Sequence, residues 1–528
     1  MKIRDEDIAE IHAKRLEQTH SDANKPHFDN QWKTLIEGEV EANKETLNPS
    51  ILPDVNILIN DPVTVEELEE NLCKTKNKAS GEDKISNRML KMGNQNLFVS
   101  LCLLYTAILS LGYFPDAWKT GLVIMIAKAQ KDPRFSKSFR PITLLSCLSK
   151  LLELIILNRL KTHLDTLGIT NHIQAGYKKG RSGQEHLLRL VQTTYQAFNN
   201  KQSVYACFLD MEAAFDGVWT KGLQYKILKS QLPTYLKKIT CDFLRNRRLK
   251  VKVNNAVSRI IVMLAGTPQG AVLSPELFKI YTDDLVPHIP RPIAPAAYAD
   301  DWALWLVCKH KLEAILMMQE ALDCLWFWCG KWRLSLSAAK SVTVFFNHCP
   351  TNEDDTLGVY IDGTAIAQKT ACKFLGVKVD QKLTWKDHTD ETIGRSKYKV
   401  DLIKDLGIRQ RRKFPESLVK FMNILITPIF TYGGPCFLPM SHCHWDKIDV
   451  FQTQSLRKIL GIPRHVSDSR VLDAAFAPKL SETIRTASLK RLESIMESSP
   501  FSFELENTVI PDPMQSYVSP LHCLLETQ

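Results

Sequence analysis

The sequence predicts an α+β fold, in which a small sheet is covered by helices and a mainly helical region follows. Between residues 200 and 350, short apolar runs of strand-forming residues alternate with helical stretches. Beyond residue 390 the strand patterns fade and helical patterns dominate. The composition, 44% hydrophobic and 24% charged over 528 residues, is that of a globular chain with room for several domains.

Helical patterns come first along the chain. Residues 64–72 begin with Thr64 and carry Glu67 three positions later, which is a capping-box start. Residues 148–168 repeat Leu or Ile every four positions and predict a helix that ends at Gly168. The apolar run 97–112 has the length of one buried helix and is too short to span a bilayer.

Residues 1–60 are polar and weakly patterned, so we expect a weakly structured N-terminal extension. The charged N-terminus has no signal-peptide core. These features predict a soluble, intracellular protein with no membrane partner. The formal net charge of +10 favours a polyanionic partner, and thirteen singly scattered cysteines indicate reduced core residues rather than a disulfide framework.

Strand patterns occupy the middle of the chain. Residues 203–210, "SVYACFLD", form a compact apolar run that ends abruptly in Asp210. Residues 247–264 predict a hairpin that turns at two asparagines, and residues 296–308 and 341–347 predict two further strands. Helical patterns return at residues 451–461 and 486–498.

Two acidic pairs stand close together, "YTDD" at 281–284 and "YADD" at 298–301. The first ends an amphipathic helix that starts at Ser274, where the helix dipole disfavours anions. We expect its aspartates to face water and Tyr281 to lie in the core. The second interrupts an apolar strand pattern, and its two carboxylates can serve one site only if the chain makes a tight hairpin near Asp300.

Burying carboxylates in apolar surroundings costs free energy unless a cation neutralises them, which favours a metal site at "YADD". The alternative is an exposed turn with two aspartates, which would have a similar sequence. Asp210 ends its own strand, and three carboxylates converge if that strand lies beside the one after Asp300. Oxygen-only ligands suit Mg²⁺, and a pair of such ions supports in-line attack on an α-phosphate. The chemistry predicted is nucleotidyl transfer.

Five motifs follow one another in order: "SFRPITLLSCLSKLLELIILNRL", "QAGYKKGRS", "FLDMEAAFDGVW", "AGTPQGAVLSP" and "YADD". With the segments around them, between about residues 75 and 465, they resemble the reverse transcriptases of non-LTR (LINE-type) retrotransposons, and the jockey-like branch fits best. The resemblance implies a right-hand polymerase with fingers, a palm containing a small antiparallel sheet flanked by helices, and a helical thumb. It implies RNA-directed DNA synthesis with two Mg²⁺ ions, for which Mn²⁺ substitutes.

Individual residues take their expected roles from the motifs they match. The implied metal ligands and catalytic carboxylates are Asp210, Asp300 and Asp301, and Lys340 is the implied proton donor to departing pyrophosphate. The implied deoxynucleotide contacts are Lys128, Arg140, Phe215, Gln269 and Gly270. Phe215 would exclude a ribose 2′-hydroxyl, and the alternative is that it only packs in the core. For Lys128 and Arg140 the alternative is that they are ordinary surface residues. Residues 374–377 resemble a hairpin that grips the primer end.

The resemblance also implies an organisation and partners. We expect the extension at 1–60, a helical lead-in at 61–107, the reverse transcriptase domain at 108–378, and a helical thumb and C-terminal region at 379–528. The partners would be an RNA template, a DNA primer or nicked target DNA, and deoxynucleoside triphosphates, in a cytoplasmic ribonucleoprotein or the nucleus. The basic clusters 245–253 and 409–414 are either phosphate contacts or solvated surface.

Departures from the family pattern keep a rival reading open. "SAAKS" stands where Asn-Pro-x-Lys-Thr is common, and no endonuclease, cysteine knuckle or ribonuclease H region is recognised. The sequence resembles the polymerase part of a longer reading frame or a truncated copy, and an endonuclease acting in trans is a possible partner. The alternative is a weakened, truncated copy that only binds RNA. Within polymerases, a group II intron or telomerase-like enzyme shares the palm motifs.

Overall fold

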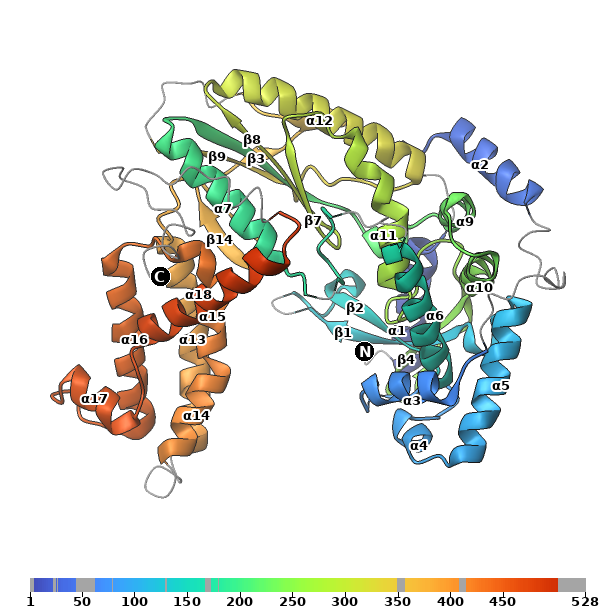
Figure 1. The fold of residues 1–528 in the computed structure, drawn as a ribbon, viewed down its shortest axis with the longest axis horizontal. Coiled ribbons are helices and arrows are strands. Elements are labelled where there is room, and N and C mark those ends of the chain that lie inside the picture. Colours follow the sequence, from blue (N-terminus) through green and yellow to red (C-terminus); the bar gives the residue numbers. More distant parts are fainter. Residues whose placement is uncertain are drawn as a thin grey trace. The chain divides into compact units, whose positions relative to one another are not determined.

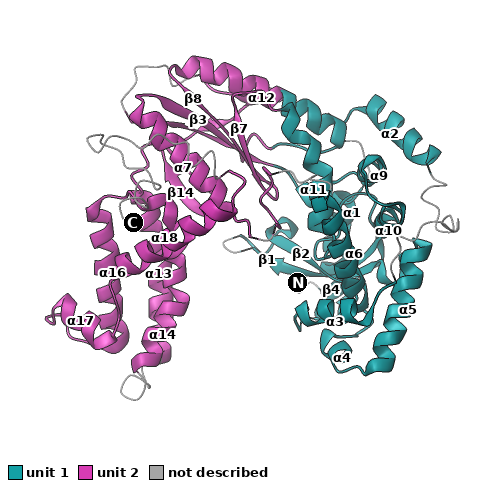
Figure 2. Ribbon diagram, in the orientation of Figure 1, with its two compact units in different colours: residues 1–171, 211–288, 324–336 teal, residues 172–210, 289–323, 337–528 magenta. Residues whose placement is uncertain are grey.

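The computed structural model describes residues 4–501 apart from 22–24, 26, 44–61, 78, 129–130, 167–171, 179, 349–356 and 408–414. The chain packs as two compact units, each assembled from separated stretches (Figure 2). Unit 1 holds residues 1–171, 211–288 and 324–336, and unit 2 holds residues 172–210, 289–323 and 337–528. The contiguous domain boundaries expected from the sequence remain predictions. The fold is α+β, as predicted (Figure 1).

A mixed sheet forms one part of unit 1. Its order is β2 (Phe139–Leu144), β1 (Thr120–Ala127), β4 (Arg248–Val253) and β5 (Ala256–Val257), and β6 (Ile261–Val262) also pairs with β4. The predicted hairpin is confirmed, because β4 and β5 pair antiparallel around Asn254, whose positive φ of 50° asparagine tolerates better than most residues.

Helices make up the rest of unit 1. Their bounds are α3 (Val65–Lys74), α4 (Asn87–Lys91), α5 (Gln95–Leu111), α6 (Cys147–Thr166), α8 (Ala214–Gly217), α9 (Thr220–Lys229), α10 (Thr234–Leu244) and α11 (Ser274–Thr282). The predicted start of α3 is confirmed, since the Thr64 hydroxyl accepts a hydrogen bond from the Glu67 amide at 3.1 Å. α6 also agrees with its prediction, and Gly168 lies outside the described residues.

Two expectations for unit 1 are wrong. The N-terminal extension is not weakly structured throughout, because α1 (Asp5–Thr19) and α2 (Asn30–Ala42) are helices. The buried face of α1 consists of Ala9, His12, Ala13 and Leu16. These residues have helical spacing but little apolar bulk, so the amphipathic pattern that would predict a helix is weak. α5 is not buried all round, since Leu103 is 68% exposed.

Unit 2 is built on a five-stranded sheet of order β12 (Ala367–Gln368), β9 (Val342–Phe346), β3 (Ser203–Asp210), β8 (Asp301–Cys308) and β7 (Ala294–Tyr298). Pairing is antiparallel except between β12 and β9, which agrees with the small antiparallel sheet predicted. Val204, Ala206 and Phe208 alternate on the face that packs against α7 (Gly183–Asn199). The first half of α12 (Lys311–Trp332) also belongs to this unit (Figure 2).

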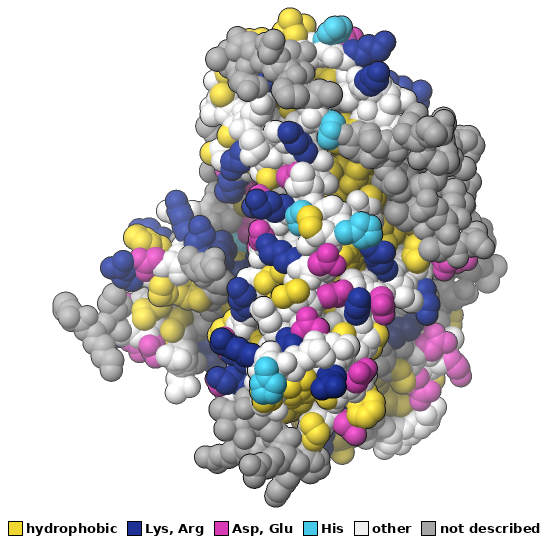
Figure 3. All heavy atoms as spheres, turned by 90° about the vertical axis from the view of Figure 1, so that its left-hand side faces the viewer, with side chains coloured by type: hydrophobic (Ala, Val, Ile, Leu, Met, Phe, Trp, Pro, Cys, Tyr) yellow, Lys and Arg dark blue, Asp and Glu magenta, His cyan; other side chains and the backbone are white. Residues whose placement is uncertain are grey.

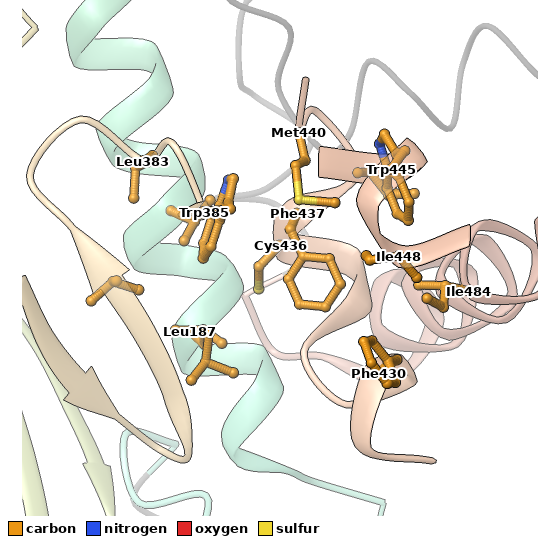
Figure 4. Close-up of a cluster of buried hydrophobic side chains, with 14 of the residues drawn as sticks. Leu187, Leu383, Trp385, Phe430, Cys436, Phe437, Met440, Trp445, Ile448 and Ile484 are labelled. Atoms are coloured by element: carbon orange, nitrogen blue, oxygen red, sulfur yellow. The ribbon is translucent and has the colours of Figure 1, made fainter. Parts of the chain in front are cut away.

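C-terminal helices share the core of that sheet. Their bounds are α13 (Lys386–Gly407), α14 (Pro415–Leu425), α15 (Thr427–Thr431), α16 (His442–Leu460), α17 (Asp468–Ala475) and α18 (Leu480–Ser498). In Figure 4, Leu187 of α7 and Trp385 lie on one side of Phe437 and Trp445 of α16 lies on the other, and the Trp385 and Phe437 rings meet edge to face at 5.8 Å. No helix among the described residues is long and apolar enough to cross a membrane.

Candidate active site

The "YADD" stretch is the tip of a two-residue hairpin. Tyr298 at the end of β7 pairs with Asp301 at the start of β8, which leaves Ala299 and Asp300 as the turn. The sequence prediction of a tight hairpin near Asp300 is therefore confirmed. Ala299 has φ +58°, the positive value that primed hairpin turns require, although alanine adopts it less readily than glycine.

The strand that ends in Asp210 lies directly beside this hairpin. β3 and β8 are antiparallel, and their register places Asp210 opposite Asp301. Directly opposed residues in such a ladder have Cα atoms about 4.5–5.5 Å apart. The chain thus brings three aspartates from two sequence-distant segments to one edge of the unit 2 sheet, as predicted.

The turn at residues 337–341 braces Asp210. The Ser337 amide donates to the Asp210 carbonyl at 2.9 Å, and the Asp210 amide donates to the Ser341 hydroxyl at 3.2 Å. Lys340 Nζ lies 3.1 Å from Asp210 Oδ2. The predicted Lys340 is therefore adjacent to a carboxylate of the site. No sequence pattern distinguishes the two serines, which are buried but lie in an ordinary polar turn.

Like charges work against one another at this edge. The pKa of Asp301 is raised, mainly because burial removes hydration from its carboxylate and to a smaller extent because the charges of Asp300 and Asp210 repel it. Among the residues that the structure describes, no three acidic, histidine or cysteine side chains form a ready-made metal site. Mg²⁺ usually takes only one or two protein carboxylates and fills its other positions with water and substrate phosphates. The oxygen-only donor set and its mutual repulsion fit such a cation.

Unit 1 gathers part of the predicted nucleotide-binding set. The Gln269 amide nitrogen donates to Asp216 Oδ1 at 2.8 Å, and Asp216 follows Phe215, whose ring stacks on Phe278 at 4.6 Å. Gly270 has φ +113°, and a Cβ there would meet the Thr143 carbonyl oxygen at 2.6 Å, so the position needs glycine. Half-buried Phe215 is therefore partly core, as its plain alternative foresaw.

Lys128 and Arg140 lie at one end of the unit 1 sheet. Arg140 is exposed on β2, paired with Ile126 of β1, and Lys128 Nζ donates to the Lys137 carbonyl at 3.2 Å. Side chains at successive positions of a strand point to opposite faces of the sheet, so Pro141 and Thr143 of β2 face away from the side chain of Arg140. Pro141 and Thr143 line a cavity together with Gln269. Arg140 therefore points to the other face of the sheet from Gln269.

The second acidic pair does not resemble the first. Asp283 and Asp284 follow α11, and Tyr281 is buried as predicted. Asp284 is not simply solvated, since it pairs with Lys226 Nζ at 2.6 Å and accepts from Trp328 Nε1 at 3.2 Å. These partners lie 58 and 44 positions away, so the helical pattern alone did not reveal them.

Residues 374–377 form the tip of a hairpin between β13 (Ala371–Phe374) and β14 (Val377–Asp380). The Tyr432 hydroxyl donates to the Leu375 carbonyl at 2.7 Å and holds that tip. Its primer-gripping role remains a prediction.

The basic clusters differ from a simple phosphate track. Arg247 is 2% exposed and lies inside unit 1, and residues 409–414 lie outside the described residues. On the side of unit 2 that carries α14, α16 and α17, Lys and Arg are interspersed with acidic side chains (Figure 3).

Sequence reasoning assigned no role to individual residues of the segment that follows residue 172. Gln174 hydrogen-bonds the backbone of Ala299 at the hairpin tip. The pKa of Tyr177 is raised by burial and then by the nearby charge of Asp300, which places this tyrosine beside the acidic turn. The motif "QAGYKKGRS" pointed to the segment, but nothing in it indicated which backbone it contacts.

The region that holds these residues matches known proteins. Residues 126–379 match the family model described as reverse transcriptase (RNA-dependent DNA polymerase). The chain is 32% identical over 444 residues to the RNA-directed DNA polymerase from mobile element jockey of Drosophila melanogaster, covering 82% of this chain and 48% of that protein. It is 32% identical over 457 residues to a probable RNA-directed DNA polymerase from transposon BS, also from Drosophila melanogaster, covering 85% and 50%.

The chain spans about half the length of the curated relatives it matches. The match covers both the sheet edge with the three aspartates and the unit 1 loop with Gln269. Residues 126–379 therefore form a domain of the reverse transcriptase family, and over 82% of its length the chain is similar to the RNA-directed DNA polymerase of the mobile element jockey.

Proposed function

We propose that this chain is an RNA-directed DNA polymerase that adds deoxynucleotides to a primer 3′-hydroxyl on an RNA template. The observation that carries the proposal is the register of β3 and β8, which sets Asp210 opposite Asp301 with Asp300 next to it. Two Mg²⁺ ions at such carboxylates supply activation of the attacking hydroxyl and neutralisation of the leaving pyrophosphate. Asp210 and Asp300 would hold them most directly.

The chain's other residues bind and orient the reactants in this proposal. Lys340 carries an ammonium group beside Asp210 and is the proton donor proposed for the departing pyrophosphate. Phe215, stacked on Phe278, presents a rigid ring that would exclude a ribose 2′-hydroxyl. Lys128 and Arg140 would contact the triphosphate from the exposed face of the sheet, and Gly270 gives a close backbone approach. Gln269, whose amide is bonded to Asp216 on the opposite face, would hold the loop that carries Gly270.

Primer extension on an RNA template separates this proposal from RNA binding without catalysis. We expect the chain to extend an annealed DNA primer in the presence of Mg²⁺. Asp210→Ala and Asp300→Ala should reduce the rate at least about a thousandfold, because several kcal/mol of transition-state stabilisation are lost. Circular dichroism and RNA affinity should remain close to those of the unaltered chain.

Two outcomes would count against the enzyme. Tight RNA binding by a folded chain without any extension would favour the binding-only alternative. Full activity in folded Asp300→Ala would contradict the assigned site.

A further inference from the structure

The hairpin that carries Asp300 depends on an unfavourable backbone conformation. Ala299 has φ +58° at a turn of only two residues, a region that L-amino acids with a Cβ rarely occupy. Such conformations persist where the surrounding structure holds them, and they concentrate at functional sites. Something outside the hairpin should therefore fix this turn.

Gln174 makes that contact with both ends of its side-chain amide. Its Oε1 accepts a hydrogen bond from the Ala299 amide at 2.7 Å, and its Nε2 donates to the Ala299 carbonyl at 3.0 Å. The side chain is 3% exposed, so water does not compete for these groups. Oε1 also accepts from the Gly176 amide at 3.1 Å, which fixes the amide's own orientation.

The backbone around Gln174 is seated on the same hairpin. The Ala175 amide donates to the Ala297 carbonyl at 2.9 Å, and the Ala297 amide donates to the Ile173 carbonyl at 3.3 Å. A Cβ at Gly176 would lie 2.6 Å from the Ala299 nitrogen, so only glycine permits this approach. The segment thus extends the edge of β7 up to the turn.

We propose that Gln174 is a positioning residue whose amide holds the Ala299 turn in the conformation that sets Asp300 beside Asp301 and Asp210. It touches no substrate and acts through the turn. The inference rests on the proposed function for its role in catalysis, but the clamp itself concerns the geometry of the acidic group. Divalent-cation binding by the protein alone therefore reports on it directly.

Three variants test the clamp against simple packing. Gln174→Ala removes all three hydrogen bonds, whereas Gln174→Glu retains the acceptor for Ala299 and Gly176 but replaces the donor with a second oxygen. Ala299→Gly permits positive φ without a Cβ, so the turn no longer needs to be held. The readouts are Mn²⁺ affinity of the protein by electron paramagnetic resonance, and the Mg²⁺ dependence of single-turnover primer extension.

We expect Gln174→Ala to weaken Mn²⁺ binding about tenfold, because a fluctuating turn disperses the carboxylates. Half-maximal extension should need correspondingly more Mg²⁺, with RNA affinity unchanged. The Mn²⁺ affinity of Gln174→Glu should lie between those of the unaltered chain and Gln174→Ala. In this variant one hydrogen bond is lost and a repulsive contact with the Ala299 carbonyl replaces it. Adding Ala299→Gly to Gln174→Ala should recover most of the lost Mn²⁺ affinity, which a purely packing role for Gln174 would not predict.

The clamp is overturned if folded Gln174→Ala binds Mn²⁺ within twofold of the unaltered chain. If that variant does not fold, unchanged Mn²⁺ binding in Gln174→Glu overturns it equally, as does an unaltered chain that binds no Mn²⁺. An unaltered chain that binds Mn²⁺ but extends no primer defeats the proposed function, while the Mn²⁺ series still decides the clamp. If the unaltered chain extends the primer and Gln174→Ala changes neither the Mn²⁺ affinity nor the Mg²⁺ dependence of extension, the clamp is contradicted and the proposed function is not.

Discussion

Each aspartate of the candidate site has different immediate surroundings. Asp210 is paired with Lys340 and its backbone is fixed by Ser337 and Ser341. Asp301 has its pKa raised by lost hydration and by the two neighbouring aspartates. A raised folded-state pKa means that the ionised carboxylate costs stability at every pH above that value, and that the cost disappears below the unfolded-state value.

Asp301→Asn should therefore stabilise the metal-free protein at pH 7. Because the side chain is partly exposed and screened, we expect a gain of only about 0.5 kcal/mol in the free energy of unfolding. Urea unfolding in EDTA measures this gain. Adding Mg²⁺ at about 100 times its Kd should reverse the order, since binding stabilises the unaltered chain by about 2.7 kcal/mol. A variant less stable than the unaltered chain in EDTA would contradict the repulsion.

At the scale of elements, helix α6 organises the loop that carries Gln269 and Gly270. Glu153 is fully buried on α6 and accepts from the Val272 amide at 2.6 Å and from the Ser149 hydroxyl at 2.9 Å. Burial raises its pKa, whereas the charge of Arg247 favours the ionised form. Burial in turn lowers the pKa of Arg247 to about 10. The cluster 245–253 thus contributes an internal counter-charge rather than a phosphate contact at this position.

Glu153→Ala should lower the free energy of unfolding by about 3–5 kcal/mol, because it leaves the buried Arg247 and the loop amides of Val272 and Leu273 without their carboxylate. Glu153→Gln should cost less, since its amide oxygen still accepts from the loop. Chemical denaturation measures both values, with the exposed Glu70→Ala on α3 as the control, which should change stability by less than about 0.5 kcal/mol. An equal effect of Glu153→Ala and Glu70→Ala would exclude this role for α6.

At the scale of the whole molecule, unit 2 joins the sheet and the C-terminal helices in one core, and that core holds histidines in neutral form. His388 on α13 is 8% exposed, burial lowers its pKa to about 4, and its Nδ1 accepts from the Lys378 amide at 3.3 Å. Burial also lowers the pKa of His186 on α7 to about 3. Unfolding allows both to protonate near pH 6.5, so stability falls as pH falls from 6.5 toward 4.

His388→Gln should reduce this acid sensitivity. A shift from 6.5 to about 4 corresponds to about 3 kcal/mol of stability lost at the acid end of that window. The glutamine can accept from Lys378 but does not titrate. The measurement is the unfolding free energy at several pH values between 4.5 and 7, with the exposed His310→Gln as the control. Identical slopes for the two variants would rule out His388 as a cause.

The sequence predicted secondary structure correctly where the pattern involves residues that are close together in the chain. The run 203–210, the turn around Asp300 and the helices at 451–461 and 486–498 follow from local period, and each is present. Contacts between distant residues were not predictable. Gln174 meets Ala299 across 125 positions, and a single glutamine carries no pattern. Helix α1 was missed because alanine and histidine supply most of its buried face.

The most direct test of the account compares the two acidic pairs in one assay. Primer extension on an RNA template with Mg²⁺ is measured for the unaltered chain, Asp300→Asn and Asp283→Asn. Asp300 lies in the hairpin beside Asp301 and Asp210, whereas Asp283 follows α11. We predict a loss of at least about a hundredfold for folded Asp300→Asn, because a proposed metal-binding carboxylate is replaced by a neutral amide, and a change below about threefold for Asp283→Asn. Undiminished extension by Asp300→Asn, or equal losses in both variants, would contradict the assignment of the active site.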